Sequence, residues 1–131
     1  MITDSISDMI ARIKNGLRVQ KKQITIPHSK LKENIAKILV KEGFIKNCKK
    51  IKRQKKQFLQ LFLKYKDQET PAISEIKRIS RPGRRFYVGQ KEMIRLTKGF
   101  GFLILSTPKG VMTDKGAKKV GVGGEVICRI W

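Results

Sequence analysis

The sequence predicts an α+β fold of two small modules, an N-terminal α-β-α-β-β module and a C-terminal module that is mostly β with one short helix. Three observations predict it. Apolar residues recur at helical spacing twice before residue 43, two longer strand-like runs follow from residue 44, and an acidic, strand-breaking segment interrupts the chain at 67–71. We therefore expect the modules to span residues 1–66 and 72–131, joined by a linker at 67–71.

The first module should begin with a helix, because apolar residues from Ile6 to Leu17 fall three or four positions apart. A short strand is expected at 23–26, where polar and apolar residues alternate. A second helix should follow Ser29, a natural N-cap, and stop at Gly43, which suits a left-handed C-cap.

A β-hairpin should complete the first module. Strand-like runs at 44–51 and 58–65 flank a polar stretch at 52–57. Four cations of that stretch, Lys52, Arg53, Lys55 and Lys56, would form a basic tip that has to face solvent or phosphate.

The second module should be built mainly from strands. These are expected at 73–79, 100–106 and 125–131. A turn follows the first strand at Arg81-Pro82-Gly83, because proline and glycine favour tight turns. Thr113 could cap a short helix that reaches about Val120.

The charge of the chain indicates a polyanionic partner. Lys and Arg number 31 against 10 Asp and Glu, which gives a formal net charge of +21 at pH 7. A compact body with that self-repulsion normally binds a polyanion, and nucleic acid is the partner we expect. A lipid surface is the less favoured alternative, since no apolar run approaches the roughly 18 residues of a membrane span. No leader peptide pattern opens the sequence, so we expect the protein to work where it is made.

Groups that could perform catalysis are scarce in the sequence. Cys48 and Cys128 stand alone, without metal-ligand spacing, and the single histidine, His28, lies beside Pro27, where a turn residue is expected. The glycine-rich runs at 99–102 and 121–124 lack the spacing of phosphate-binding loops. Those glycines could form simple turns, permit a positive φ angle, let a partner's backbone come close or contact RNA. We expect no enzyme activity, cofactor, metal or small-molecule substrate.

Two further clusters suggest contacts with RNA. Arg81, Arg84 and Arg85 surround the Pro82-Gly83 turn, and Tyr87 could stack on an unpaired base or instead pack into the module. Ser106, Thr107 and Lys109 follow a buried strand, where hydroxyls and amides suit RNA sugars and base edges.

In combination the segments resemble the bacterial and organellar form of ribosomal protein S8, over the full length of the chain. The resemblance rests on six motifs in order: TDSISDMIARIKN (3–15), SKLK (29–32), ILVKEGFI (38–45), KRISRPG (77–83), LSTPKGVMTD (105–114) and GVGGEV (121–126). It implies a structural constituent of the small ribosomal subunit that is a primary rRNA-binding protein. Such a protein binds a hairpin in the central domain of small-subunit rRNA and helps to assemble the platform, as a monomer beside neighbouring small-subunit proteins.

The resemblance also nominates binding residues. In the second module these are Tyr87, Ser106, Thr107, Lys109, Gly110, Gly123, Gly124 and Glu125. The first helix supplies a second RNA-facing surface with Thr3, Arg12, Lys14, Asn15 and Arg18. Since carboxylates repel phosphate, Glu125 would accept hydrogen bonds from the neighbouring loop or from a base amino group. The alternative function is a free RNA chaperone or messenger-RNA-binding regulator with the same fold.

Some positions depart from the family pattern. Pro108 stands where serine is usual, Arg84 replaces a common leucine, Phe86 a β-branched residue and Gly116 a common glutamate. These changes shift the balance toward phosphate attraction. The terminal Trp131 and the abundant Lys and Ile resemble plastid-encoded members, so we expect a ribosome of the plastid (chloroplast) stroma, with the bacterial cytoplasm as the alternative.

Overall fold

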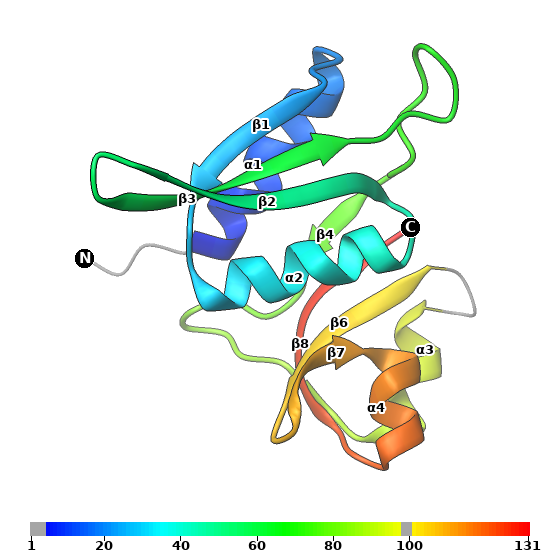
Figure 1. Ribbon diagram of the computed structural model, residues 1–131. Helices are drawn as coiled ribbons and strands as arrows, with labels where there is room; N and C mark the ends of the chain where they lie inside the picture. The colour runs from blue at the N-terminus through cyan, green and yellow to red at the C-terminus, as the bar shows by residue number, and fades with distance from the viewer. Residues whose placement is uncertain (1–4, 98–100) are drawn as a thin grey trace. The chain divides into compact units, whose positions relative to one another are not determined.

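A computed structural model describes residues 5–97 and 101–131 of the chain (Figure 1). The described chain divides into two compact units, Ser5–Ser74 and Glu75–Trp131. Each unit has its own helices and antiparallel sheet, which confirms the α+β class with two modules. Thr3 and the first residue of the strand expected at 100–106 lie outside the described residues.

The first unit has the predicted α-β-α-β-β order. Its elements are α1 (Ser5–Arg18), β1 (Gln23–Pro27), α2 (Lys30–Lys41), β2 (Ile45–Arg53) and β3 (Lys56–Leu63). The three strands form an antiparallel sheet in the order β1-β3-β2, so β3 is central (Figure 1). Asp67 accepts hydrogen bonds of 2.8 Å from the backbone amides of Glu69 and Thr70, which makes 67–71 a tight turn. That this turn is the linker between modules stays a prediction.

Both helices of the first unit pack on the same face of the sheet. Leu59, Leu61 and Leu63 of β3 are buried, as the period of two along a strand requires. A Cβ on Gly16 of α1 would lie 3.1 Å from Leu63, so the glycine lets α1 approach closely. Cys48 is the β2 partner of Leu61, and burial raises the pKa of its thiol, with smaller electrostatic effects from Lys37 and Glu33 of α2.

The start of α2 confirms the predicted N-cap. Ser29 has extended backbone, and its hydroxyl accepts a hydrogen bond of 3.1 Å from the amide of Lys32. His28 does more than form a turn, because its Nε2 lies 2.7 Å from Oε1 of Glu33. Lys37 reaches the other oxygen of Glu33 at 3.0 Å. Hydrogen bonds from His28 and then Lys37 lower the pKa of Glu33 from 4.5 to about 2.

The second unit is built around its last strand. The elements are β4 (Ile76–Arg78), β5 (Tyr87–Val88), the 3-10 helix η1 (Gln90–Glu92), α3 (Met93–Thr97), β6 (Phe102–Thr107), β7 (Gly110–Thr113), α4 (Asp114–Val120) and β8 (Gly124–Ile130). The sheet order is β4-β8-β6-β7, and β5 also pairs with β8. Strand β8 therefore pairs with three other strands.

The second unit has more helices than the single one that the sequence predicts. Helix α4 is the predicted one, with Thr113 as N-cap accepting a hydrogen bond of 3.1 Å from Gly116 and Gly121 as left-handed C-cap. Helix α3 is an addition of five residues that buries Met93. Such a short helix offers less than two turns of periodicity, so no helical pattern stands out in the sequence.

The hairpin tip is tighter than the stretch predicted at 52–57. Strands β2 and β3 pair as far as Arg53 and Lys56, which leaves only Gln54 and Lys55 in the turn. These two residues have φ angles of +50° and +66°. A two-residue hairpin with both angles positive is a type I′ turn, which favours Asn and Gly rather than long side chains.

Replacement of Lys55 by glycine should stabilise the hairpin. A left-handed backbone costs a non-glycine residue about 1 to 2 kcal/mol. Glycine avoids this cost, but its unfolded chain has more conformational entropy, which offsets part of the gain in stability. We expect Lys55→Gly to raise the free energy of unfolding by about 0.5 to 1 kcal/mol in urea titrations. Lys52→Gly, inside β2, is the control and should lower it. Equal destabilisation by both changes would refute the turn geometry.

The depressed pKa of Glu33 predicts acid sensitivity. A carboxyl whose pKa is lower in the folded chain contributes stability above its unfolded pKa and loses it as pH falls toward its folded pKa. For Glu33 this window runs from 4.5 down to about 2. As pH falls from about 5 to 3, the free energy of unfolding should therefore decrease less for Glu33→Gln than for the unaltered chain. The exposed Glu69→Gln is the control, and matching slopes for the two variants would count against the interaction.

Candidate nucleic-acid interface

Three candidate side chains form one row across the second unit. Glu125 of β8 is the register partner of Tyr87 on β5 and of Ser106 on β6. Directly opposed residues of antiparallel strands point to the same face of a sheet. The adjacent Val88, Leu105 and Val126 are buried in the core. The row therefore places a ring, a carboxylate and a hydroxyl together from three distant parts of the sequence.

Glu125 is held by the chain itself. Ser80 donates a hydrogen bond of 2.5 Å to Oε2 of Glu125, and Arg85 donates one of 2.9 Å to the same oxygen. Burial acts to raise the pKa of Glu125, but the hydrogen bonds from Ser80 and Arg85 outweigh it and lower the pKa. The carboxylate is thus charged and partly neutralised by Arg85, so its repulsion of a phosphate is reduced. Glu125 is expected to accept hydrogen bonds from the neighbouring loop or from a base amino group, and the structure contains the hydrogen bonds from the loop.

The arginine-rich loop is a tight turn. Arg81 and Arg84 exchange backbone hydrogen bonds of 3.0 and 2.9 Å across Pro82 and Gly83. Gly83 has φ of +81°, and proline followed by a left-handed glycine is the sequence of a type II turn. Arg81, Arg84 and Arg85 are exposed. Three guanidinium groups are therefore displayed on a rigid backbone.

Tyr87 follows this loop and points into solvent. Its exposed fraction is 66%, which excludes the alternative in which the ring packs into the module. The amide of Phe86 donates a hydrogen bond of 3.1 Å to the hydroxyl of Ser80, and Val126 donates one of 2.9 Å to the carbonyl of Phe86. The ring of Tyr87 thus projects from a backbone that is fixed on both sides.

The β6–β7 turn uses one of the nominated hydroxyls internally. Thr107 donates a hydrogen bond of 2.8 Å to the carbonyl of Gly110 and accepts one of 3.1 Å from the amide of Lys109. Gly110 has φ of +115°, and Pro108 and Lys109 are exposed at the tip. Thr107 therefore shapes the turn that displays Lys109 at the end of β6 and β7.

Gly123 and Gly124 are glycines because backbones pass close to them. A Cβ on Gly123 would lie 2.4 Å from the carbonyl oxygen of Val88, and one on Gly124 would lie 2.3 Å from that of Ser106. The expectation of a partner's backbone is corrected at these two glycines, because the backbone that approaches them is this chain's own. The glycines bring β5 and β6 against the end of β8, which forms the row.

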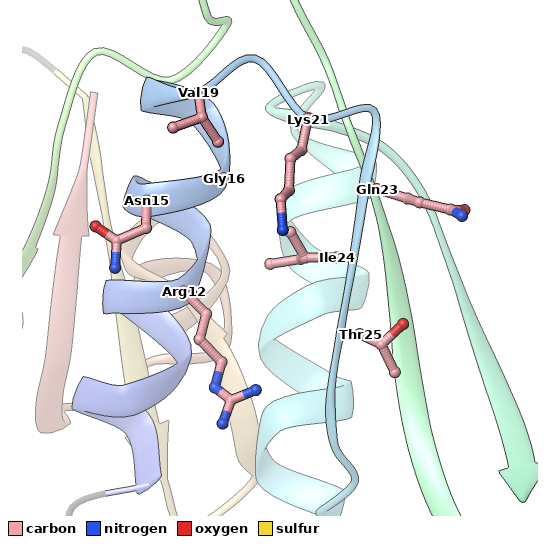
Figure 2. Close-up of a pocket in the computed structure, with 8 residues that line it drawn as sticks. All are labelled: Arg12, Asn15, Gly16, Val19, Lys21, Gln23, Ile24 and Thr25. Atoms are coloured by element: carbon pink, nitrogen blue, oxygen red, sulfur yellow. The ribbon is translucent and has the colours of Figure 1, made fainter.

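The candidates on α1 border a hollow of about 470 Å³ in the first unit (Figure 2). Arg12 and Asn15 line it from α1, opposite Lys21 and Ile24 (Figure 2). Arg12 also pairs with Asp8 at 3.0 Å. Arg18 is exposed, whereas Lys14 is half-buried and does not line the hollow. The structure thus brings two of the nominated α1 residues together.

The four cations of the hairpin tip, Lys52, Arg53, Lys55 and Lys56, are all exposed. The described residues contain no cluster of three or more His, Cys, Asp and Glu that could hold a metal ion. Among the helices in the described ranges, none combines the length and apolar character needed to cross a bilayer. Cys128 is buried, which raises the pKa of its thiol to about 12.

Comparison with known proteins identifies the family. The family model described as ribosomal protein S8 matches residues 4–131. The chain belongs to the ribosomal protein S8 family. It is therefore a ribosomal protein of the small subunit. The S8 family consists of structural ribosomal proteins and not of enzymes.

Bacterial members of the S8 family are similar over their whole length. Small ribosomal subunit protein uS8 of Thermus aquaticus is 49% identical over 138 aligned positions, with all of both chains covered. The uS8 proteins of Geobacter sulfurreducens and Dictyoglomus thermophilum are 48% and 46% identical, each with 99% of this chain and 98% of the relative covered.

Sequence reasoning missed Ser80 as a site residue of this S8 chain. Its exposed fraction is 0%, and its hydroxyl joins the loop amide of Phe86 to the carboxylate of Glu125. A serine just before Arg81-Pro82-Gly83 was a usable signal, because hydroxyls often bond backbone amides at turns. The partner Glu125 lies 45 positions away, so only strand pairing reveals it.

Removal of the Ser80 hydroxyl should loosen the arginine loop. Ser80→Ala leaves the amide of Phe86 without its acceptor and takes one donor from Glu125. A buried polar group that loses its partner costs about 1 to 3 kcal/mol, so the unfolding free energy should fall by that amount in urea titrations. Ser74→Ala, at an exposed serine, is the matched control. Losses of the same size in both variants would contradict the bridging role.

Proposed function

We propose that the chain is a primary rRNA-binding protein, which binds a hairpin in the central domain of small-subunit rRNA through its second unit and helps to assemble the platform. The row of Tyr87, Glu125 and Ser106 is the observation that carries the proposal. It combines a stacking ring, a held carboxylate and a hydroxyl on one face. Such a set suits unpaired bases and 2′-hydroxyls, which proteins read in RNA, better than a regular duplex.

Each group of the row has a distinct role in the proposal. Tyr87 stacks on an unpaired base, and Ser106 bonds a sugar or base edge. Glu125 acts through Ser80 and Arg85, because it fixes the loop that presents Tyr87. Gly110, Gly123 and Gly124 allow the strand ends and the turn that place these groups together.

The cations contribute affinity without selecting sequence. Arg81, Arg84 and Arg85 bind phosphates beside the row, as does Lys109. Lys52, Arg53, Lys55 and Lys56 bind phosphates at the hairpin tip, and Arg12, Lys14, Asn15 and Arg18 contact rRNA from α1. Each neutralised phosphate releases counterions, so these contacts weaken as salt concentration rises.

We also propose that the ribosome concerned is that of a plastid, on the basis of Trp131 and the abundance of Lys and Ile. The relatives reported above are bacterial, and they fit the alternative setting of a bacterial cytoplasm. Neighbouring small-subunit proteins would be further partners in either setting.

Loss of one group of the row should reduce selectivity. We expect Tyr87→Ala or Ser106→Ala to weaken binding to the central-domain hairpin by about 1 to 3 kcal/mol and to change binding to unrelated RNA little, in filter-binding titrations. Lys52→Ala should weaken binding to both RNAs and make the affinity less steeply dependent on salt concentration. If the row variants lost equal affinity for every RNA, the row would have no part in recognition.

A further inference from the structure

The first unit leaves one face of its sheet uncovered by its own helices. Because α1 and α2 pack on the face of Leu59, Leu61 and Leu63, the intervening residues of β3 point to the opposite face. There Phe62 is flanked by Gln23 of β1 and Asn47 of β2 as its register partners. Near the end of the central strand β3, this face therefore presents an aromatic ring between two amides.

Phe62 is half-buried, and hollows lie on both sides of it. One has a volume of about 780 Å³ and is lined by Lys22, Gln23, Lys46, Phe62, Leu63, Lys64 and Tyr65. The other has about 390 Å³ and is lined by Lys46, Asn47, Lys49 and Phe62. Volumes of this order accommodate a small ligand. Phe62 and Lys46 are common to both hollows.

The backbone places Lys46 at the hollows. The pairing of β2 with β3 is irregular between Ile45 and Asn47, so Lys46 is an extra residue in the strand. In regular alternation Lys46 would point away from the face that holds Asn47. A bulge changes the direction of a side chain, and Lys46 lines both hollows beside Phe62.

The charged residues described around Phe62 are positive. Lys22, Lys46, Lys49 and Lys64 line the two hollows, and among the described residues no carboxylate lines either of them. The Nζ atom of Lys49 lies 5.5 Å from the centre of the Phe62 ring. This contact is weak at an exposed position, so an incoming aromatic ring can displace the ammonium group, which is then available to a phosphate.

We propose that this sheet face binds an unpaired segment of RNA, with one base stacked on Phe62 and the flanking phosphates bound by the lysines. A sheet face that combines an aromatic ring on its middle strand with amides and lysines offers the groups that single-stranded nucleic acid requires. The site shares no residue with the proposed hairpin site, so either can fail alone. An acidic peptide would complement the positive charge of the lysines, but it would offer no surface that matches the Phe62 ring and the amides.

The test uses the full chain and a labelled oligonucleotide of about six uridines, a length typical of single-strand sites. Binding is followed by fluorescence anisotropy at about 0.3 M salt, where contacts made only with phosphate are weakened. Phe62→Leu removes the ring, and Phe62→Tyr keeps it. Phe58→Leu is the matched control, because Phe58 lies on the same strand and face but does not line either hollow.

We expect Phe62→Leu to weaken oligonucleotide binding about tenfold, while Phe62→Tyr and Phe58→Leu stay within about twofold of the unaltered chain. Phe62→Leu should bind the central-domain rRNA hairpin within about twofold of the unaltered chain, which separates this site from the hairpin site. The proposal is overturned if Phe62→Leu binds normally or if Phe58→Leu loses as much. It is likewise overturned if a hexaglutamate peptide competes as well as unlabelled oligonucleotide, because the face would then recognise charge alone.

Discussion

Electrostatic self-repulsion is the constraint on which the rest of the structure depends. With a net charge of +21, the chain folds with few carboxylates to offset its cations, and three of them make structural contacts. Asp8 pairs with Arg12 on α1, Glu33 joins His28 to Lys37 at the start of α2, and Glu125 ties Ser80 and Arg85 to β8. Acids placed this way hold elements together and leave most surface cations for a polyanion. One distribution of charge therefore serves both the internal contacts of the fold and the proposed affinity for nucleic acid.

In the proposed function, different groups supply the general attraction to phosphate and the recognition of a particular RNA. Lysines and arginines on turns and hairpin tips attract any phosphate, which gives affinity without sequence preference. The row on β5, β8 and β6 contains only one charged group, and this group is already paired with Arg85. The row can therefore favour one RNA over another by stacking and hydrogen bonding. Its geometry depends on Gly123 and Gly124, since a side chain at either position would collide with a neighbouring backbone.

The sequence predicted those parts of the fold that local patterns determine. The two long helices have clear apolar periodicity, and Ser29, Thr113 and the Pro82-Gly83 turn carry local capping or turn signals. Helix α3 and strands β5 and β7 are too short for such patterns. The link from Ser80 to Glu125 and the face around Phe62 depend on strand register, which joins residues distant in sequence. Motif resemblance supplied Glu125 as a candidate, and its contacts required the three-dimensional structure.

The central claim is that general charge supplies affinity whereas the second unit supplies recognition. The most direct measurement compares the affinity of the unaltered chain for the central-domain rRNA hairpin and for a scrambled hairpin of equal length, at two salt concentrations. The account predicts a preference for the rRNA hairpin of about tenfold or more that survives the higher salt while both affinities fall. Equal affinities that decline together as salt rises would contradict it, because binding would then be counterion release alone.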